Sequence, residues 1–244
     1  MIPDWKLPPG VDRPLWDYVH NESLAHNYDA GLADSSLFRL DLDFVRAFAG
    51  SSGRLIDLGC GTGRLLAALD TQVWTCVGVD LSASMLGIAR QKVPSAHLVQ
   101  ANLTQLEAFA PQSFDAAVCL FSTLGMVRGE SERRRVIAGT YRLLRPGGRF
   151  ILHVHNRWFH LWNSAGRAWL LSGTGERVMP AHQGVTGLTL YQFTRREVIG
   201  LLATEGFRTI EVHPISIASD GRVMWPWLWP GLRAYGYLIA AERC

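Results

Sequence analysis

The sequence predicts an α/β fold with a doubly wound, mostly parallel sheet, and two repeated observations support it. Apolar runs at 55–58, 75–79 and 113–120 show little polar alternation, which is typical of parallel strands covered on both faces. Helical patterns follow two of these runs, at 64–69 and 82–91. Alternating strands and helices favour one sheet with helices on both sides. A chain of 244 residues with 48% hydrophobic residues can fill the core of one such domain.

The turn after the first strand narrows the choice of ligand. Gly59, Gly61 and Gly63 allow a sharp bend and a close approach of a ligand, because no Cβ is present. A dinucleotide fingerprint needs its third glycine where Arg64 stands, and no Gly-Lys-Ser/Thr sequence completes a P-loop. Asp57 would repel a phosphate there. The turn therefore favours a ligand with a cationic group, with a purely structural turn as the alternative.

The second strand also ends in an acid, Asp80. It lies 17 residues beyond Gly63, close to the distance of about 20 residues at which an acid hydrogen-bonds a ribose in nucleotide-binding folds. The alternative role is a helix N-cap, which Ser82 can fill equally well. We therefore expect Asp80 to bind the hydroxyl groups of a ribose.

Three motifs together resemble those of class I S-adenosylmethionine-dependent methyltransferases of the small-molecule type. They are Asp-Leu-Gly-Cys-Gly-Thr-Gly at 57–63, Val-Gly-Val-Asp-Leu-Ser at 77–82 and Leu-Arg-Pro-Gly-Gly at 144–148. They stand in the family's order and spacing, and the resemblance runs from about Phe44 to the C-terminus. The implied cofactor, S-adenosylmethionine, has no phosphate but carries a ribose diol, an ammonium group and a sulfonium. The family's sheet has seven strands, and the resemblance makes the last one, 235–242, antiparallel.

The resemblance also implies a set of cofactor contacts at the strand ends. Asn102 stands where the family usually has an acid that binds the adenine amino group, and its side-chain carbonyl can still accept from that group. The segment after the fourth strand lies at the switch point where doubly wound sheets bind ligands. The expected cofactor-binding residues are Tyr28, Asp57, Gly59, Cys60, Gly61, Asp80, Leu81, Met85, Asn102, Leu103, Phe121 and Ser122.

The chain is expected to form a single methyltransferase domain, 1–244, in four parts. These are an N-terminal helical cap, a cofactor-binding half, a substrate lid and the C-terminal strands, at 1–49, 50–155, 156–192 and 193–244. The cap is expected to hold one helix over 15–31 and a second over 36–48. Tyr28 in the cap is a contact to the methionine end of the cofactor or, alternatively, a half-buried core residue.

Candidates for catalysis are few. His153 and His155 share one face of the fifth strand beside the lid, so either is a candidate base for a phenol or acid acceptor, with a structural role as the alternative. A sulfonium is already electrophilic, so the protein mainly has to align two molecules and exclude water. No metal-ligand cluster is close in sequence, so no metal site is predicted.

The lid and the C-terminal region carry many aromatic residues. The lid's content suits an apolar or aromatic acceptor, with a cap that has its own small core as the alternative. Thr194 and Glu197 form a capping box that predicts a helix start. The tryptophans of 225–229 could line a pocket, form a dimer contact or touch a membrane surface, and the sequence does not choose among these.

Composition excludes some classes of partner. The net charge of +3 and the scattered arginines indicate no nucleic-acid footprint. Four dispersed cysteines indicate neither a disulfide framework nor a zinc site. We find no signal-peptide pattern and no run of about 20 apolar residues, so a cytoplasmic location is expected. A homodimer is one of the open oligomeric states.

The sequence thus predicts methyl transfer from S-adenosylmethionine to a nitrogen or oxygen atom of a small, apolar or aromatic molecule. Two alternatives stay open. One is a non-catalytic S-adenosylmethionine-binding protein, in which the glycine turn and Asp80 would also be present. The other is a methyltransferase that acts on a protein or RNA, which the modest charge disfavours for RNA.

Overall fold

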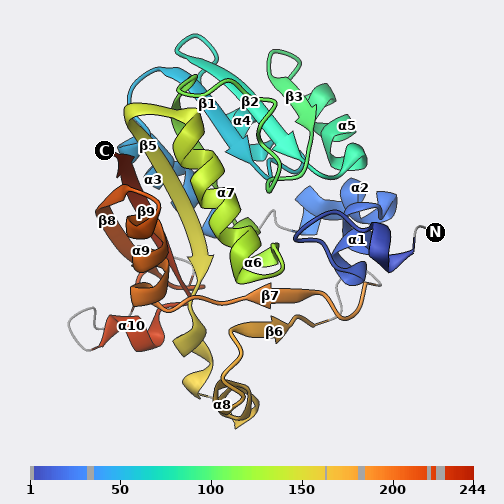
Figure 1. The fold of residues 1–244 in the computed structure, drawn as a ribbon, viewed down its shortest axis with the longest axis vertical. Coiled ribbons are helices and arrows are strands. Elements are labelled where there is room, and N and C mark those ends of the chain that lie inside the picture. The colour runs from blue at the N-terminus through green and yellow to red at the C-terminus, as the bar shows by residue number, and fades with distance from the viewer. Residues whose placement is uncertain (1–2, 32–35, 163, 181–184, 219–220, 224–228) are drawn as a thin grey trace.

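The fold is known from a computed structural model that describes residues 3–31, 36–162, 164–180, 185–218, 221–223 and 229–244 (Figure 1). The main sheet has seven strands in the order β3-β2-β1-β4-β5-β9-β8. Strands β1 to β5 are parallel, whereas β9 is antiparallel to both β5 and β8. The predicted doubly wound sheet and its antiparallel last strand are therefore confirmed.

The helices and strands have the following bounds. The helices are α1 (Arg13–Val19), α2 (Glu22–Gly31), α3 (Ser36–Phe48), α4 (Arg64–Ala68), α5 (Ala83–Lys92), α6 (Thr123–Met126), α7 (Glu130–Leu143), α8 (Ser164–Leu171), α9 (Arg195–Thr204) and α10 (Pro230–Arg233), with 3-10 helices η1 (Asp4–Lys6) and η2 (Arg157–Trp162). The strands are β1 (Gly53–Leu58), β2 (Trp74–Asp80), β3 (His97–Gln100), β4 (Phe114–Cys119), β5 (Leu144–His155), β6 (Glu176–Val178), β7 (Thr189–Tyr191), β8 (Phe207–Ile215) and β9 (Gly236–Arg243).

The two faces of the sheet bury two separate apolar cores, which is why the strands carry so few polar residues. On β1, Ile56 points into one core with α7 and α9, whereas Leu55 points into the other with α3, α4 and α5. Both side chains are completely buried. Successive residues of a strand face opposite ways, so a strand that is covered on both sides must be apolar at nearly every position.

The N-terminal cap holds two helices where one was predicted over 15–31. Helix α1 ends at Val19, and α2 begins at Glu22. The side chain of Asn21 accepts a hydrogen bond from the backbone N–H of Leu24 at 3.0 Å and so starts the second helix. The prediction of a single helix was wrong because this cap had not been recognised.

Helix α6 begins at Thr123, soon after the end of β4, and contains Gly125, a residue type that by itself suggests a loop. A Cβ on Gly125 would lie 2.5 Å from the carbonyl oxygen of Tyr191. The glycine is therefore required by the close approach of β7 rather than by a flexible connection. The capping box of α9, in contrast, is present as predicted, with both the Thr194 and the Glu197 side chains bonded to backbone N–H groups.

The first two helices and the two-stranded ribbon lie at the carboxyl ends of the parallel strands. Figure 1 shows α1 and α2 beside this edge and the two-stranded ribbon of β6 and β7 running along it. Helix α2 packs on α5, and β7 packs on α6. A cavity lies between the sheet, the N-terminal helices and the ribbon.

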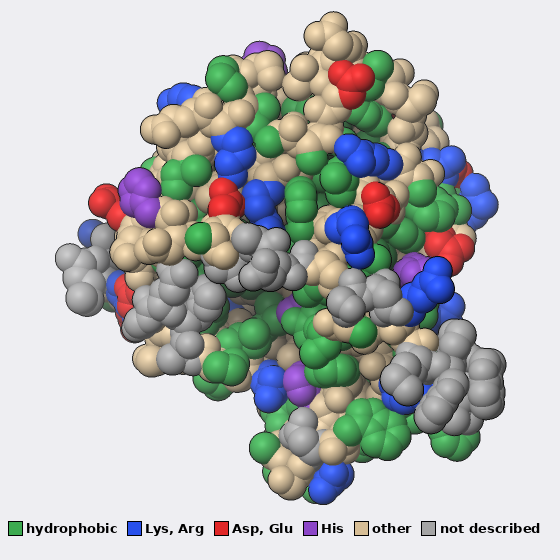
Figure 2. Space-filling view, turned by 180° about the vertical axis from the view of Figure 1, so that it is seen from behind, with side chains coloured by type: hydrophobic (Ala, Val, Ile, Leu, Met, Phe, Trp, Pro, Cys, Tyr) green, Lys and Arg blue, Asp and Glu red, His purple; other side chains and the backbone are tan. Residues whose placement is uncertain are grey.

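The surface carries mixed charge. Figure 2 shows Lys and Arg side chains interspersed with Asp and Glu over the upper part of one face of the molecule. Within the described part of the chain, no helix is long and apolar enough to cross a bilayer. The residues 224–228, which include most of the Trp-rich loop of the sequence, lie outside the described residues, and the adjacent Trp229 is 72% exposed.

Candidate functional site

Three cavities lie at the carboxyl edge of the sheet and meet at two residues. Tyr28 of α2 and Thr123 of α6 line all three. The first cavity extends along the end of β2 and the start of α5, the second lies under the β6–β7 ribbon, and the third lies between the glycine turn and α3. We call them the nucleoside cavity, the acceptor cavity and the amino-acid cavity, after the groups that their shapes and charges suit.

The glycine turn shapes the wall between the nucleoside and amino-acid cavities. Gly59, Gly61 and Gly63 all adopt positive φ angles, of 84°, 53° and 74°. A Cβ on Gly59 would lie 2.5 Å from Cγ2 of Thr123, whereas nothing lies within 4 Å of a Cβ on Gly61. Gly61 therefore faces open space, where its bare backbone is accessible to a ligand.

Asp80 ties this turn to the next helix and also lines the nucleoside cavity. Its carboxylate accepts hydrogen bonds from the N–H groups of Gly61 and Ser82, each at 2.8 Å. Burial raises the pKa of Asp80, although these N–H groups act in the opposite direction. Each carboxylate oxygen has a further lone pair, so both are able to accept from a vicinal diol.

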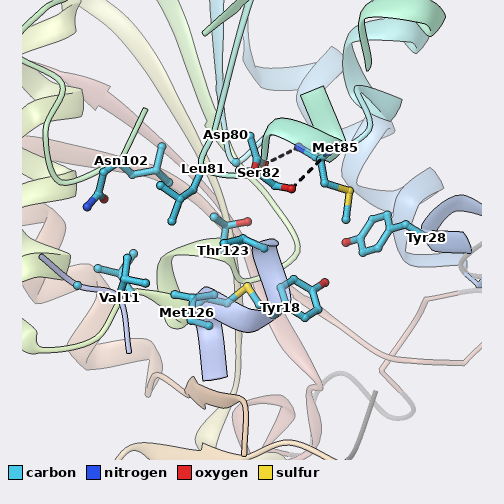
Figure 3. Close-up of a pocket in the computed structure, with 17 residues that line it drawn as sticks. Val11, Tyr18, Tyr28, Asp80, Leu81, Ser82, Met85, Asn102, Thr123 and Met126 are labelled. Atoms are coloured by element: carbon cyan, nitrogen blue, oxygen red, sulfur yellow. Dashed lines mark hydrogen bonds between the residues drawn. The ribbon is translucent and has the colours of Figure 1, made fainter. Parts of the chain in front are cut away.

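The rest of the nucleoside cavity is largely apolar. Figure 3 shows Asn102 at one end, Tyr18 and Tyr28 at the other, and Asp80 and Leu81 between them. Met85 and Leu103, both predicted contacts, also line this cavity. A flat ring bound between such side chains would be shielded from water.

Asn102 and the N-terminal segment close the far end of the nucleoside cavity. The side-chain amide of Asn102 donates to the carbonyl oxygen of Pro9 at 2.8 Å, and its oxygen accepts from the N–H of Thr104 at 3.1 Å. The oxygen has a second lone pair, so the predicted contact to an adenine amino group is compatible with the structure. Gly10 and Val11 line the cavity next to it.

Asp57 lines the amino-acid cavity as a buried acid without a hydrogen-bond donor. The residue is 4% exposed, and no described residue donates a hydrogen bond to its carboxylate. Burial, together with the negative charge of Asp80, raises the pKa of Asp57 to about 8. A carboxylate in this state lacks a positive partner, and an ammonium group of a ligand would supply one.

Two tyrosines separate the nucleoside cavity from the acceptor cavity. Tyr18 and Tyr28 line both cavities. Burial raises the pKa of both phenols, so both stay protonated near neutral pH. They place two neutral, hydrogen-bonding oxygens at the junction of the cavities.

The acceptor cavity is uncharged. It has a volume of about 410 Å³, which suits a small molecule of one or two rings. Among the described residues that line it, none is Asp, Glu, Lys or Arg. They are Tyr18, Tyr28, Leu37, Phe121, Thr123, Met126, His155, Met179, Pro180, Leu188, Thr189, Leu190 and Tyr235.

The structure separates the two candidate histidines. His155 lines the acceptor cavity, with its ring centroid 4.5 Å from that of Tyr235. His153 is completely buried and lines none of the three cavities; its Nδ1 lies 2.8 Å from Oδ1 of Asp41, which is also completely buried. Burial, helped by the neighbouring His153 and His160, lowers the pKa of His155 to about 3. His155 is therefore a neutral, weakly basic imidazole at pH 7.

The two predicted contacts in the segment after β4 have different positions. Phe121 lines the acceptor and amino-acid cavities. Ser122 is completely buried and lines none of the three cavities, and its Oγ accepts from the N–H of His155 at 3.2 Å. Both residues have positive φ angles, of 50° and 59°, which non-glycine residues rarely adopt. Ser122 thus supports the turn, whereas Phe121 and Cys60 line the amino-acid cavity.

The lid region contributes aliphatic rather than aromatic walls. Met179, Leu188 and Leu190 line the acceptor cavity, whereas Trp162 is 61% exposed and the indole N–H of Trp169 donates to the backbone of the lid itself. The aromatic surface of the cavity comes instead from the tyrosines, Phe121 and Tyr235 described above. Residues 181–184 of the lid lie outside the described residues.

Several lining residues could not be identified from the sequence. Gly10, Tyr18 and Tyr235 belong to segments far from the three motifs, and no spacing links them to the glycine turn. Arg64 was not among the predicted contacts, yet it lines the amino-acid cavity together with several of them. In the described part of the chain, no group of His, Cys, Asp and Glu is placed to hold a metal ion.

Comparison with known proteins points to one family. The sequence model described as "Methyltransferase domain" matches residues 56–152. A protein from Geobacillus sp. (strain WCH70) that is named as a methyltransferase is 36% identical over 107 residues, which cover 42% of each chain. The ubiquinone biosynthesis O-methyltransferase of Aromatoleum aromaticum is 32% identical over 125 residues, or 49% of this chain and 52% of that one. The chain thus spans about half the length of the curated relatives that it matches.

Solved structures extend the similarity to nearly the whole fold. The 1,6-didemethyltoxoflavin-N1-methyltransferase of Burkholderia thailandensis, solved with 1,6-didemethyltoxoflavin and S-adenosylhomocysteine, superimposes with a TM-score of 0.64. The match covers 93% of this chain and 86% of that one, at 20% sequence identity. At this identity the match shows a common fold.

Proposed function

From the methyltransferase domain that residues 56–152 match, and from the class I fold around it, we propose that this chain transfers a methyl group from S-adenosylmethionine to a small molecule. The observation that carries the proposal is the meeting of three cavities at Tyr28 and Thr123. Two of them suit the two ends of the cofactor, and the third suits an acceptor. Their junction is then the place of the transfer.

The residues of the first two cavities fit the cofactor. The Asp80 carboxylate can accept from the ribose diol, and the Asp57 carboxylate, which has no donor within the described protein, can pair with the α-ammonium group. When bound, S-adenosylmethionine supplies a methyl group on a positively charged sulfur. The chain's own contribution is to align the acceptor with that group and to exclude water.

The third cavity favours an uncharged, flat acceptor with a nitrogen or oxygen nucleophile. Removing a charged molecule from water costs several kcal/mol unless an opposite charge meets it, and no described lining residue provides one. Tyr18 and His155 offer neutral hydrogen-bonding groups that can orient the nucleophile. A cytoplasmic location and a homodimer stay predictions.

The test has a binding step and a product step. Calorimetric titration with S-adenosylhomocysteine should show one site per chain, and Asp80→Asn should weaken it about 10-fold or more, as expected for the loss of a charged acceptor. Asp43→Asn, an exposed acid on α3, is the matched control and should bind as the wild type does.

In the product step, the protein is incubated with methyl-labelled S-adenosylmethionine and pairs of aromatic molecules that differ only in a charged group. Labelled product should form from the neutral member of a pair. Absence of S-adenosylhomocysteine binding, or product only from the charged members, would refute the proposal. Binding without product from any acceptor would favour the non-catalytic alternative.

A further inference from the structure

The amino-acid cavity contains one cation as well as the acid Asp57. Arg64 is the first residue of α4 and directly follows Gly63, which caps the helix in a left-handed conformation. Its side chain is 16% exposed and lines the cavity together with Asp57. The cavity is therefore bordered by both a carboxylate and a guanidinium group.

Three aromatic rings hold the Arg64 guanidinium group in position. Its central carbon lies 4.6 Å from the ring centroid of Phe121, 4.8 Å from that of Phe38 and 5.7 Å from that of Tyr28. Contacts of a guanidinium with aromatic rings use the flat face of the cation, and they leave its N–H groups at the edge available for hydrogen bonds. The rings come from α2, α3 and the segment after β4, so the cation is fixed by the fold and not by its own helix.

Among the described residues, Arg64 has no strong partner for those N–H groups. Its Nε lies 3.9 Å from Oδ1 of Asp29, which is too far for a hydrogen bond. The Asp29 carboxylate is already bound by the hydroxyl of Thr62, at 2.6 Å, and by the ammonium of Lys92. No described residue accepts a hydrogen bond from the Arg64 guanidinium.

Within the part of the chain that the structure describes, one cavity holds an acid without a donor and a fixed arginine without an acceptor. Together they match a ligand group that carries both charges. A planar carboxylate can take two parallel hydrogen bonds from a guanidinium group, which is the geometry that arginine provides and lysine does not. We propose that Arg64 binds the α-carboxylate of the methionine end of S-adenosylmethionine, while Asp57 binds the α-ammonium. This inference rests on the proposed function. It assigns to Arg64 the preference for a ligand that carries an α-carboxylate as well as an α-ammonium group.

The proposal is tested with ligands that differ in one group. Decarboxylated S-adenosylmethionine lacks only the carboxylate, so the wild type should bind it about 10- to 100-fold more weakly than S-adenosylmethionine, as expected for a lost charged hydrogen bond. In Arg64→Met, the affinity for S-adenosylmethionine should fall by the same factor, while the affinity for the decarboxylated ligand stays within about 3-fold of the wild type. Arg64→Lys should lie in between, because a point charge replaces the planar pair of donors.

Arg54→Met is the matched control. Arg54 also lies over an aromatic ring, that of Phe114 at 5.2 Å, but lines none of the three cavities. It should leave both affinities unchanged. Thermal melts of each variant test folding, and Arg64→Lys keeps the test possible if Arg64→Met does not fold.

The outcomes separate the two proposals. If Arg64→Met weakens both ligands equally, Arg64 only supports the cavity walls, and the inference on the carboxylate is wrong. If the wild type binds the two ligands equally well, the inference is also wrong, although the cofactor assignment stands. If the wild type binds neither S-adenosylmethionine nor S-adenosylhomocysteine, the proposed function itself fails.

Discussion

Binding of the cofactor should release a proton from Asp57. Because burial and Asp80 raise the pKa of Asp57 to about 8, the ligand-free protein holds about 0.9 proton on this carboxyl at pH 7. An α-ammonium group against the carboxylate favours the charged form and lowers its pKa again. If that pKa returns to the ordinary value of 3.8 or below, almost the whole proton leaves when the ligand binds at pH 7.

The assay is isothermal titration with S-adenosylhomocysteine at pH 7 in buffers with different ionisation enthalpies. The observed heat should change between buffers in proportion to about 0.9 proton released per ligand bound. The affinity should also rise with pH by nearly tenfold per unit around pH 7 and level off above about pH 9, where Asp57 is already ionised. Protonation of the ligand's own amine is corrected for with Asp57→Asn.

Asp57→Asn removes the titrating group while keeping its size, so its binding heat should be the same in every buffer near pH 7. Asp43→Asn, on the exposed side of α3, should behave as the wild type. Equal heats in all buffers for the wild type would refute the reasoning, since Asp57 would then be ionised before the ligand arrives.

Three further predictions concern stability and closure. Because the pKa of Asp57 is raised in the folded protein, the contribution of Asp57 to stability falls as pH rises from about 4 to 8. Asp57→Asn should therefore raise the melting temperature of the ligand-free protein by about 4 °C or more at pH 9 and by much less at pH 5. An equal change at both pH values would contradict this. Asp29→Asn weakens the link of α2 to Thr62 and Lys92, so stopped-flow measurements should show S-adenosylhomocysteine leaving several-fold faster, whereas an unchanged rate would mean that α2 closes without this link. Gly125→Ala places a Cβ 2.5 Å from the carbonyl oxygen of Tyr191 and should cost about 1–3 kcal/mol in urea unfolding, whereas Gly200→Ala, at an exposed position of α9 where a Cβ meets nothing within 4 Å, should not destabilise the protein.

Much of the sheet could be predicted from local patterns. Residues 55–58 and 113–120 contain apolar runs that only a strand covered on both faces explains, and β1 and β4 lie there. The box formed by Thr194 and Glu197 likewise marks the start of α9, because its hydrogen bonds involve neighbouring residues only. Local signals failed where a distant contact decided the outcome, as at Gly125, whose neighbour in space is Tyr191.

Only part of the candidate site could be predicted from local sequence patterns. The acids Asp57 and Asp80 were predicted contacts, and both line the cavities. His153 and His155 were equivalent in the sequence because they share one face of a strand. The structure distinguishes them, because α3 brings Asp41 against His153, while His155 lies two residues nearer the carboxyl edge and lines the acceptor cavity.

By itself, the sequence determined the buried strands, the glycine turn and the acids at the strand ends, because each depends on residues within a few positions of one another. Only the tertiary structure decided which cation lines the same cavity as Asp57 and which residues line the acceptor cavity. Arg64 is held by Phe38 and Phe121, and the acceptor cavity is lined by Tyr18 and Tyr235, from opposite ends of the chain. Such groups meet only when helices and strands pack. Residues so far apart in the chain produce no periodic sequence pattern from which their contact could be predicted.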